Sequence, residues 1–164
     1  MDKNNCKIGE KIMNIVLMEP EIPYNTGNIG RSCVLTNTSL HLIRPFGFSL
    51  DEKQIKRAGL DYWQHIDLHE WDSLEELMAA YPESKFYFAT TKTTQRYSDV
   101  TYKENDFIVF GPESRGVPNE ILEKNRETCI TIPMIKMGRS LNLSNSAAII
   151  LYESLRQNDF NFGE

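Results

Sequence analysis

The side chains that could do chemistry in this 164-residue chain stand in three loops rich in glycine, serine or asparagine. The loops read NTGNIGR (25–31), FGPESRG (110–116) and RSLNLSN (139–145). Arg31 is expected near the first turn of a helix capped by Asn25 or Thr26, where a cation is unfavourable against the helix dipole. It therefore calls for an anionic partner. That partner is either a carboxylate of the protein or a substrate phosphate, and spacing alone leaves both open.

The second loop has two interpretations. A restrained turn with a surface pair between Glu113 and Arg115 is the simpler one. The other is a preset backbone whose N–H and C=O groups line a ligand site. The sequence contains neither GxGxxG nor GxxxxGK[ST], so a Rossmann dinucleotide loop and a Walker phosphate loop are both unsupported.

The third loop leads into an apolar helix, for which Ser144 or Asn145 is expected to be the N-cap. Ser140 and Asn142 stand too far upstream for that role. They alternate with leucines, which predicts an extended segment with one polar face. Either this face takes a small ligand or it is an ordinary solvated loop.

The elements that must position these loops alternate along the chain. Short apolar runs predict strands buried on both faces, at 14–20, 39–45, 85–91, 106–112 and 129–134. Helices are expected at 26–37, 51–59, 72–81 (with Asp72 as N-cap), 119–125 and 144–157. This order predicts an α/β fold with a mostly parallel sheet covered by helices. Such sheets bind ligands beyond the carboxyl ends of their strands, where all three loops lie.

Composition narrows the class of protein. With 40% hydrophobic and 25% charged residues, the chain fits a single globular domain. It lacks an apolar run of membrane-spanning length, and its polar start is not expected to be a secretory signal. Its three cysteines form no CxxC pair, so a cytoplasmic protein without a metal site is expected. The net charge of −5 argues against broad nucleic-acid binding. It does not exclude a local basic patch. The loop residues that could form one are Lys53, Lys56, Arg57, Lys92, Arg96, Lys136 and Arg139.

The three motifs, in this order, resemble the SPOUT class of RNA methyltransferases. They are most similar to the small tRNA (cytidine/uridine-34-2′-O)-methyltransferases. The segments EPEIPYNTGNIGR (19–31), KRAGLDYW (56–63) and ATTK (89–92) extend the resemblance. It implies one SPOUT domain over 13–158, with a flexible N-terminal extension at 1–12 and a tail at 159–164. It also implies that the C-terminal segment of the α/β sheet forms a deep trefoil knot.

The resemblance further implies a homodimer that uses S-adenosylmethionine, releases S-adenosylhomocysteine and needs no metal. Arg31 would act at the methyl-transfer site, often across the subunit interface, and Ser140, Asn142 or a water would accept the proton. The cofactor residues would be Ala89, Thr90, Gly111, Glu113, Ile132, Met134, Ser140, Leu141 and Asn145. The tRNA-binding residues would be Asn28, Lys53, Lys56, Arg57, Lys92, Arg96 and Arg139.

The function implied is methylation of the ribose 2′-hydroxyl of the wobble nucleotide, cytidine or modified uridine 34, in the tRNA anticodon loop. The alternatives are 2′-O-methylation of another RNA, such as ribosomal RNA, and a module that binds cofactor or RNA without turnover. The last helix bears separately on the dimer, because its first half is apolar nearly all round and needs two buried faces. Its stripe at helical spacing, which faces either the core or a partner, is Ala148, Leu151, Tyr152 and Leu155.

Overall fold

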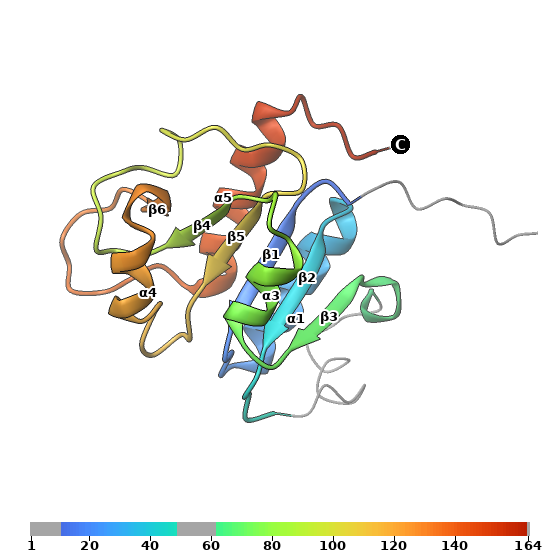
Figure 1. Ribbon diagram of the computed structural model, residues 1–164, viewed down its shortest axis with the longest axis horizontal. Helices are drawn as coiled ribbons and strands as arrows, with labels where there is room; N and C mark the ends of the chain where they lie inside the picture. Colours follow the sequence, from blue (N-terminus) through green and yellow to red (C-terminus); the bar gives the residue numbers. More distant parts are fainter. Residues whose placement is uncertain (1–10, 49–61, 164) are drawn as a thin grey trace, which may run out of the picture.

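The computed structural model describes residues 11–48 and 62–163. Its centre is a six-stranded sheet in the order β3-β2-β1-β5-β4-β6, in which every neighbouring pair is parallel (Figure 1). The strands are β1 (Asn14–Met18), β2 (Ser39–Ile43), β3 (Leu68–Trp71), β4 (Phe86–Ala89), β5 (Phe107–Phe110) and β6 (Cys129–Ile130). The predicted parallel sheet is therefore confirmed, with one strand, β3, that the sequence did not predict.

Helices cover both faces of this sheet. They are α1 (Pro23–Leu35), α3 (Leu74–Ala80), α4 (Asn119–Lys124) and α5 (Leu143–Gln157), with short 3₁₀ turns η1 (Trp63–His65) and η2 (Arg126–Thr128). The helix expected at 51–59 lies outside the described residues. The N-cap of α3 is Ser73, whose hydroxyl accepts a hydrogen bond from the backbone N–H of Glu76 at 3.1 Å, and not Asp72 as predicted.

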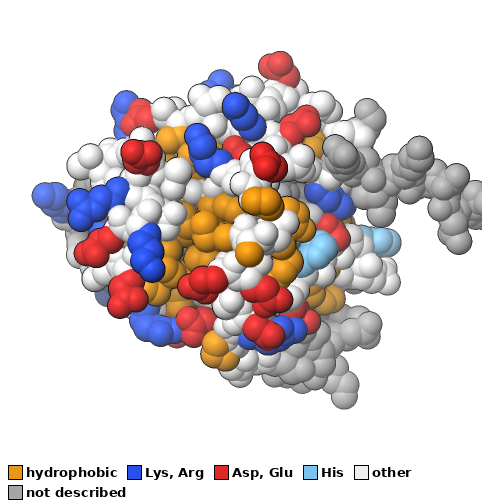
Figure 2. Space-filling view, in the orientation of Figure 1, with side chains coloured by type: hydrophobic (Ala, Val, Ile, Leu, Met, Phe, Trp, Pro, Cys, Tyr) orange, Lys and Arg blue, Asp and Glu red, His pale blue; other side chains and the backbone are white. Residues whose placement is uncertain are grey.

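Two hydrophobic layers hold the helices to the sheet. On β1, Ile15 and Leu17 belong to the cluster that contains α1 and α5 residues, whereas Val16 and Met18 belong to the cluster that contains α3 and α4 residues. Successive strand side chains point to opposite faces, so a strand covered on both sides must be apolar throughout. This explains why β1 and β5 read as unbroken apolar runs. Figure 2 shows the face of α3 and α4, with apolar side chains at its centre and charges of both signs around them.

The chain at Ile130 and Thr131 passes between two parts of one long connection. On one side, the backbone N–H of Thr90, directly after β4, donates to the carbonyl of Ile130 at 2.9 Å. On the other side, Thr131 donates to the carbonyl of Gln95 at 2.8 Å and accepts from Tyr97 at 2.9 Å. Residues 90 and 95–97 both belong to the connection that leads from β4 to β5. The segment after β6 is thus flanked on both sides by that connection.

The two ends of the described chain meet at Asn37. Its side-chain oxygen accepts from the Lys11 ammonium at 2.9 Å, and its amide donates to the carbonyl of Phe162 at 2.9 Å. Ile12 is 3% exposed and packs in the core. The ordered fold therefore begins before the predicted boundary at residue 13, and residues beyond 158 fold back onto it.

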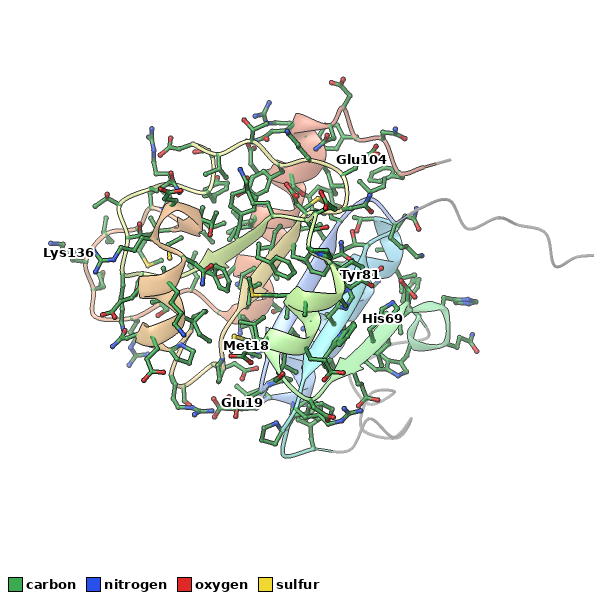
Figure 3. The ribbon with its side chains drawn as sticks, viewed as in Figure 1. Met18, Glu19, His69, Tyr81, Glu104 and Lys136 are labelled. Carbon is green, nitrogen blue, oxygen red and sulfur yellow. The ribbon has the colours of Figure 1, made fainter. Side chains whose placement is uncertain are left out.

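A buried histidine lies on the α3 side of the sheet. His41, on β2, is fully buried and accepts a hydrogen bond at Nδ1 from the Trp71 indole N–H at 3.0 Å. The indole only donates, so the His41 proton sits on Nε2, which lies 3.0 Å from Oδ1 of Asn14. The His41 ring stacks on His69 at 4.7 Å, and Tyr81 lies edge-on to it at 6.0 Å (Figure 3). Burial, together with the nearby His69, lowers the pKa of His41 to about 3.

Candidate active site

A cleft of about 500 Å³ opens at the carboxyl ends of β4, β5 and β6, beside the first turn of α1. All three sequence motifs contribute to its wall: Ile22 and Asn25 line it from α1, residues 110–117 from the loop after β5, and residues 139–143 from the loop before α5. Its volume is within the range of small-molecule and cofactor sites. It lies next to the pair β1 and β5, where the order of strands along the sheet reverses, which is where open α/β sheets bind their ligands.

The structure brings most of the predicted cofactor residues together in this cleft. Asn145 differs, because it lies in the first turn of α5 and is not part of the cleft wall. The predicted residues that line the cleft are Ala89, Thr90, Gly111, Glu113, Ile132, Met134, Ser140 and Leu141. The wall also contains residues that were not predicted to bind the cofactor, among them Phe110, Val117, Ile130 and Ile150. Phe110 belongs to the second motif, whereas Ile130 and Ile150 belong to a strand and a helix whose apolar patterns predicted only core packing.

The turn after β5 is closed so tightly that only glycine fits at its base. A Cβ on Gly111 would lie 2.1 Å from the carbonyl carbon of Gly116 and 2.2 Å from the backbone nitrogen of Val117. Gly116 itself has φ +69°, a conformation that side chains rarely adopt. The backbone of this loop is therefore fixed before any ligand binds, as its second sequence interpretation required.

Glu113 has a different partner from the one predicted. Its carboxylate accepts from the backbone N–H groups of Glu21 at 2.8 Å and Ile22 at 3.3 Å, at the start of α1. A reciprocal contact comes from Glu21, whose carboxylate accepts hydrogen bonds from the backbone N–H and the hydroxyl of Ser114 at 3.0 and 2.6 Å. Those bonds lower the pKa of Glu21. The predicted Glu113–Arg115 pair is wrong, and the two glutamates instead clamp the second motif to the first.

Asn142 caps α5, so the expected cap at Ser144 or Asn145 is wrong. Its side-chain oxygen accepts from the backbone N–H groups of Ser144 at 2.9 Å and Asn145 at 3.3 Å. Its amide nitrogen donates to the side-chain oxygen of Asn25 at 3.1 Å. The sequence argument failed because α5 begins at Leu143, one residue before the run that was counted as helix. Ser140 remains exposed on the cleft wall, as its polar character suggested.

Asn25 is a site residue that sequence reasoning missed. It was expected as a cap of α1, yet the N-cap is Ile22, which makes no side-chain cap bond. Pro23 starts the helix, since its fixed φ and missing N–H suit the first position. Asn25 therefore lies inside the first turn, 3% exposed, and faces the cleft. Proline favours the first position of a helix, so Pro23 could have predicted that α1 begins before Asn25.

Arg31 does not line the cleft of its own chain. Because α1 begins at Pro23, Arg31 lies in the second half of the helix and not near the first turn as expected. Its side chain is exposed, with the guanidinium carbon 5.1 Å from the centre of the Tyr62 ring. The cleft receives Ile22 and Asn25 from α1 and leaves Arg31 outside.

The predicted RNA-binding residues are divided by the structure. Lys92 and Arg139 lie on the cleft wall, and the Lys92 ammonium donates to the side chain of Asn119 at 2.7 Å. Arg96 forms an ion pair with Asp99 at 3.0 Å, and Asn28 is half-buried on α1. Lys53, Lys56 and Arg57 lie outside the described residues.

Arg115, on the cleft wall, forms an ion pair with Glu19 at 3.8 Å. Figure 3 shows Glu19 at the carboxyl end of β1 and Lys136 at the far side of the molecule, on the loop after β6. That loop surrounds a second hollow of about 520 Å³, which shares Thr91, Ile132 and Arg139 with the cleft. The two hollows are therefore neighbours.

Across residues 11–48 and 62–163, no helix combines the length and apolar character needed to cross a membrane. Within the same ranges, no group of three or more His, Cys, Asp and Glu residues is arranged to hold a metal ion.

Residues 12–152 match the family described as the SpoU rRNA Methylase family. The chain belongs to this family. The SPOUT resemblance of its motifs is thereby confirmed, and so is the fold class, an α/β sheet of the SpoU methyltransferases.

Individual relatives cover nearly the whole chain. A protein of Methylovorus glucosotrophus (strain SIP3-4), named a tRNA (cytidine(34)-2′-O)-methyltransferase, is 49% identical over 150 residues, covering 91% of this chain and 97% of its own. A protein of Bacillus subtilis (strain 168), to which the same activity is assigned provisionally, is 50% identical over 151 residues, covering 90% and 94%. A solved structure described as giving insights into 2-OH methylation of C/U34 on tRNA is 39% identical, with a TM-score of 0.84, and covers 92% of this chain and 99% of its own.

A more distant structure supports the fold alone. It is the SpoU methyltransferase AviRb from Streptomyces viridochromogenes, in complex with AdoMet. It is 21% identical with a TM-score of 0.77, and covers 92% of this chain and 59% of its own.

Proposed function

We propose that this protein transfers a methyl group from S-adenosylmethionine to the ribose 2′-oxygen of nucleotide 34, the wobble position, in the anticodon loop of tRNA. The observation that carries the proposal is the near-complete coverage of relatives named for this reaction, 49% identical over 150 residues in one case. The cleft supports it, because the motifs shared with that subgroup converge there.

The cleft fits S-adenosylmethionine by its chemistry. Apolar side chains such as Ile132, Leu141 and Ile150 can enclose an adenine, while the fixed backbone of the Gly111–Gly116 turn offers N–H and C=O groups to its polar edge. When bound, the cofactor supplies a sulfonium-activated methyl group, so the chain need not provide a metal or a covalent nucleophile. S-adenosylhomocysteine, the product, keeps the adenine and would make the same adenine contacts until its release.

The chain's own residues must orient the ribose and manage one proton. Arg31 stays protonated in proteins, so we do not assign it as a general base. Its guanidinium instead orients the ribose or a neighbouring phosphate and stabilises the negative charge that develops on the 2′-oxygen. A water held at the cleft wall accepts the proton, because a neutral hydroxyl or amide is too weak a base to take it. Ser140 can hold such a water, whereas the Asn142 side chain already caps α5 and donates to Asn25.

We further propose that the active unit is a homodimer, because Arg31 lies outside the cleft of its own chain. In a dimer, α1 of one protomer can deliver Arg31 to the cleft of the other. The supporting observation is a set of exposed apolar side chains on α1 and α5, two helices that pack against each other on one face of the sheet. These residues are Leu35, Ile149 and Tyr152, which are 56%, 37% and 46% exposed.

The trefoil knot remains part of the proposal. It is supported by the hydrogen bonds that hold Ile130 and Thr131 between two parts of the β4–β5 connection. In the proposed knot, this segment passes through the loop that the connection forms before it continues into α5. The domain limits near 13 and 158 are proposed from the family match over residues 12–152. The cytoplasmic location is proposed from the relatives named for tRNA modification.

Recognition of tRNA is proposed to occur around the cleft mouth. Lys92 and Arg139 provide positive charge there despite the net charge of −5 of the whole chain. Asn28, Arg96, Lys53, Lys56 and Arg57 complete the proposed contact set.

The test is methyl transfer from labelled S-adenosylmethionine to tRNA that lacks the modification, followed by mapping of the methylated nucleotide. We expect the label on the 2′-oxygen of nucleotide 34, and none on tRNA carrying a 2′-deoxyribose there. Arg31→Ala should lower the rate by about 10²–10³ and leave cofactor affinity unchanged. Arg126→Ala removes an exposed arginine in η2 that does not line the cleft; it serves as the matched control and should retain the rate.

Other outcomes would point to the alternatives. A methyl group found in ribosomal RNA and not in tRNA would show that the reaction is 2′-O-methylation but that the substrate is ribosomal RNA. Tight cofactor binding without methyl transfer to any RNA would support the alternative in which the protein binds cofactor or RNA without turnover. Full activity of Arg31→Ala would remove Arg31 from the proposed mechanism.

A further inference from the structure

We propose that Tyr62 is a positioning residue, whose ring holds the guanidinium of Arg31 in the orientation that methyl transfer requires. The inference rests on the proposed function, because Tyr62 would act only through Arg31. It adds a residue from the segment before β3, which does not line the cleft.

The contact itself is a cation–π interaction. The guanidinium carbon of Arg31 lies 5.1 Å from the centre of the Tyr62 ring, inside the roughly 6 Å at which such contacts are attractive. Arg31 is exposed on α1, and a long exposed side chain samples many rotamers. A ring in this position restricts that sampling and so presents the cation in one region of space.

The backbone next to this pair is fixed by close packing. A Cβ on Gly30 would lie 2.9 Å from the Cδ1 atom of Ile66 and 3.1 Å from the Cζ3 atom of Trp63. The segment of η1 therefore packs directly on the backbone of α1 at Gly30, which needs the absence of a side chain there. Since Gly30 precedes Arg31 and Trp63 follows Tyr62, this contact sets the distance between the cation and the ring.

The backbone of Tyr62 is held as well. Tyr62 is the N-cap of η1, and its carbonyl accepts the backbone N–H of His65 at 2.9 Å, which closes the turn. Ile66, just beyond the turn, packs against the core cluster of α1 and α5. The ring is thus attached to the folded domain on its C-terminal side.

An aromatic partner suits an arginine that must still bind substrate. A carboxylate would occupy the N–H donors of the guanidinium edge and neutralise its charge. A ring face contacts the flat side of the guanidinium and leaves its five N–H donors available for ribose and phosphate oxygens. Tyr62 therefore orients Arg31 without consuming the groups that the reaction needs.

The experiment is a double-mutant cycle measured by single-turnover methyl transfer to tRNA at saturating S-adenosylmethionine. Tyr62→Leu should lower the rate about 3- to 10-fold, as loss of one such contact implies, with unchanged cofactor affinity. Tyr62→Phe keeps the ring and should restore most of the loss. In the Arg31→Ala background, Tyr62→Leu should cause no further loss, because the residue acts through Arg31.

The matched control removes a second cation–π contact, which lies outside the proposed active site. Lys85 lies 5.9 Å from the Tyr87 ring, and Lys85→Met should leave the rate unchanged. A readout independent of activity is the NMR shift of the Arg31 Nε–Hε pair, which should carry a ring-current shift in wild type and Tyr62→Phe and lose it in Tyr62→Leu.

Three results would overturn the inference. They are an equal loss in Tyr62→Phe and Tyr62→Leu, a further loss from Tyr62→Leu in the Arg31→Ala background, and an Arg31 shift unaffected by Tyr62→Leu. Failure of the proposed function is distinguishable, since a protein without methyl transfer would still show the ring-current shift. Full activity of Arg31→Ala would instead contradict the role assigned to Arg31.

Discussion

At the scale of single residues, Gly111 shows how a missing side chain shapes the cleft. The atoms that its Cβ would meet, at 2.1 and 2.2 Å, are both backbone and cannot rotate away. We expect Gly111→Ala to spread the turn after β5, to weaken S-adenosylmethionine binding at least about tenfold, and to destabilise the fold by about 1–3 kcal/mol. Calorimetric titration with the cofactor and urea unfolding measure the two effects.

The control for this change is another glycine in a loop. A Cβ on Gly47 would meet no heavy atom within 4 Å, so Gly47→Ala should change neither cofactor affinity nor stability by a comparable amount. Wild-type cofactor affinity in Gly111→Ala would show that the tight turn does not shape the binding site.

Residue types along the chain predicted which loops meet, but not how their side chains pair. Asn142 was correctly singled out as a residue that needs an explanation, but the correct explanation, an N-cap of α5, was excluded. Its cap on α5 depends on a helix start one residue earlier than the apolar pattern suggests. Its bond to Asn25 joins positions 117 residues apart, which spacing in the sequence does not reveal.

At the scale of elements, burial on two faces made the central strands predictable. Strand β3 was missed because its sequence, LHEW, is short, places two polar residues between two apolar ones, and is mostly half-buried at the edge of the sheet. The end of α5 was predicted better than its inner face. The buried stripe is Ala147, Ile150, Leu151, Ser154 and Leu155, whereas the predicted stripe included the exposed Tyr152.

The His41 network predicts how stability depends on pH. Burial lowers the pKa of His41 to about 3, from about 6.5 in the unfolded chain. Between these values the unfolded state binds the proton and the folded state does not. Stability is therefore complete above about pH 6.5 and falls as the pH drops towards 3, by about 2 kcal/mol at pH 5.

Urea unfolding at pH 7.5 and pH 5 measures this loss. His41→Gln cannot titrate, so its stability should change less between the two pH values than that of wild type, whatever its absolute stability. His69 and Asp67 lie near the ring and remain in both proteins, which isolates the contribution of His41. An equal change in both proteins would assign the pH dependence to other groups.

At the scale of the whole molecule, the apolar faces of α1 and α5 predict the oligomeric state. We expect a dimer at micromolar concentration in sedimentation velocity. Tyr152→Glu should shift it towards monomer, because a charge would be buried at the interface without a partner. Ile135→Glu, a change at a 76% exposed site on the loop after β6, should leave the dimer intact. A stable wild-type monomer would contradict the prediction.

The proposed dimer implies that each active site contains residues of both protomers, and mixed dimers of two variants can test this. At an S-adenosylmethionine concentration well below the Kd of Gly111→Ala, Arg31→Ala and Gly111→Ala dimers are each expected to be strongly impaired alone. Co-expressed, they should form mixed dimers in which one site combines an intact cleft with an intact Arg31. Recovery of activity would support a shared site, and its absence in verified mixed dimers would place Arg31 and the cleft in the same chain.

The wall of the cleft has a consequence for the order in which the protein becomes competent during synthesis. Ile22 and Asn25 leave the ribosome early, whereas residues 139–143, which complete the cleft wall beside Asn25, are among the last quarter of the chain to emerge. A nascent chain that ends before Arg139 can pair its strands but has no enclosed cavity and no α5 to cover it. A ligand of the cleft can therefore enter only a nearly complete protein, and its uptake reports that the last segment has reached its place.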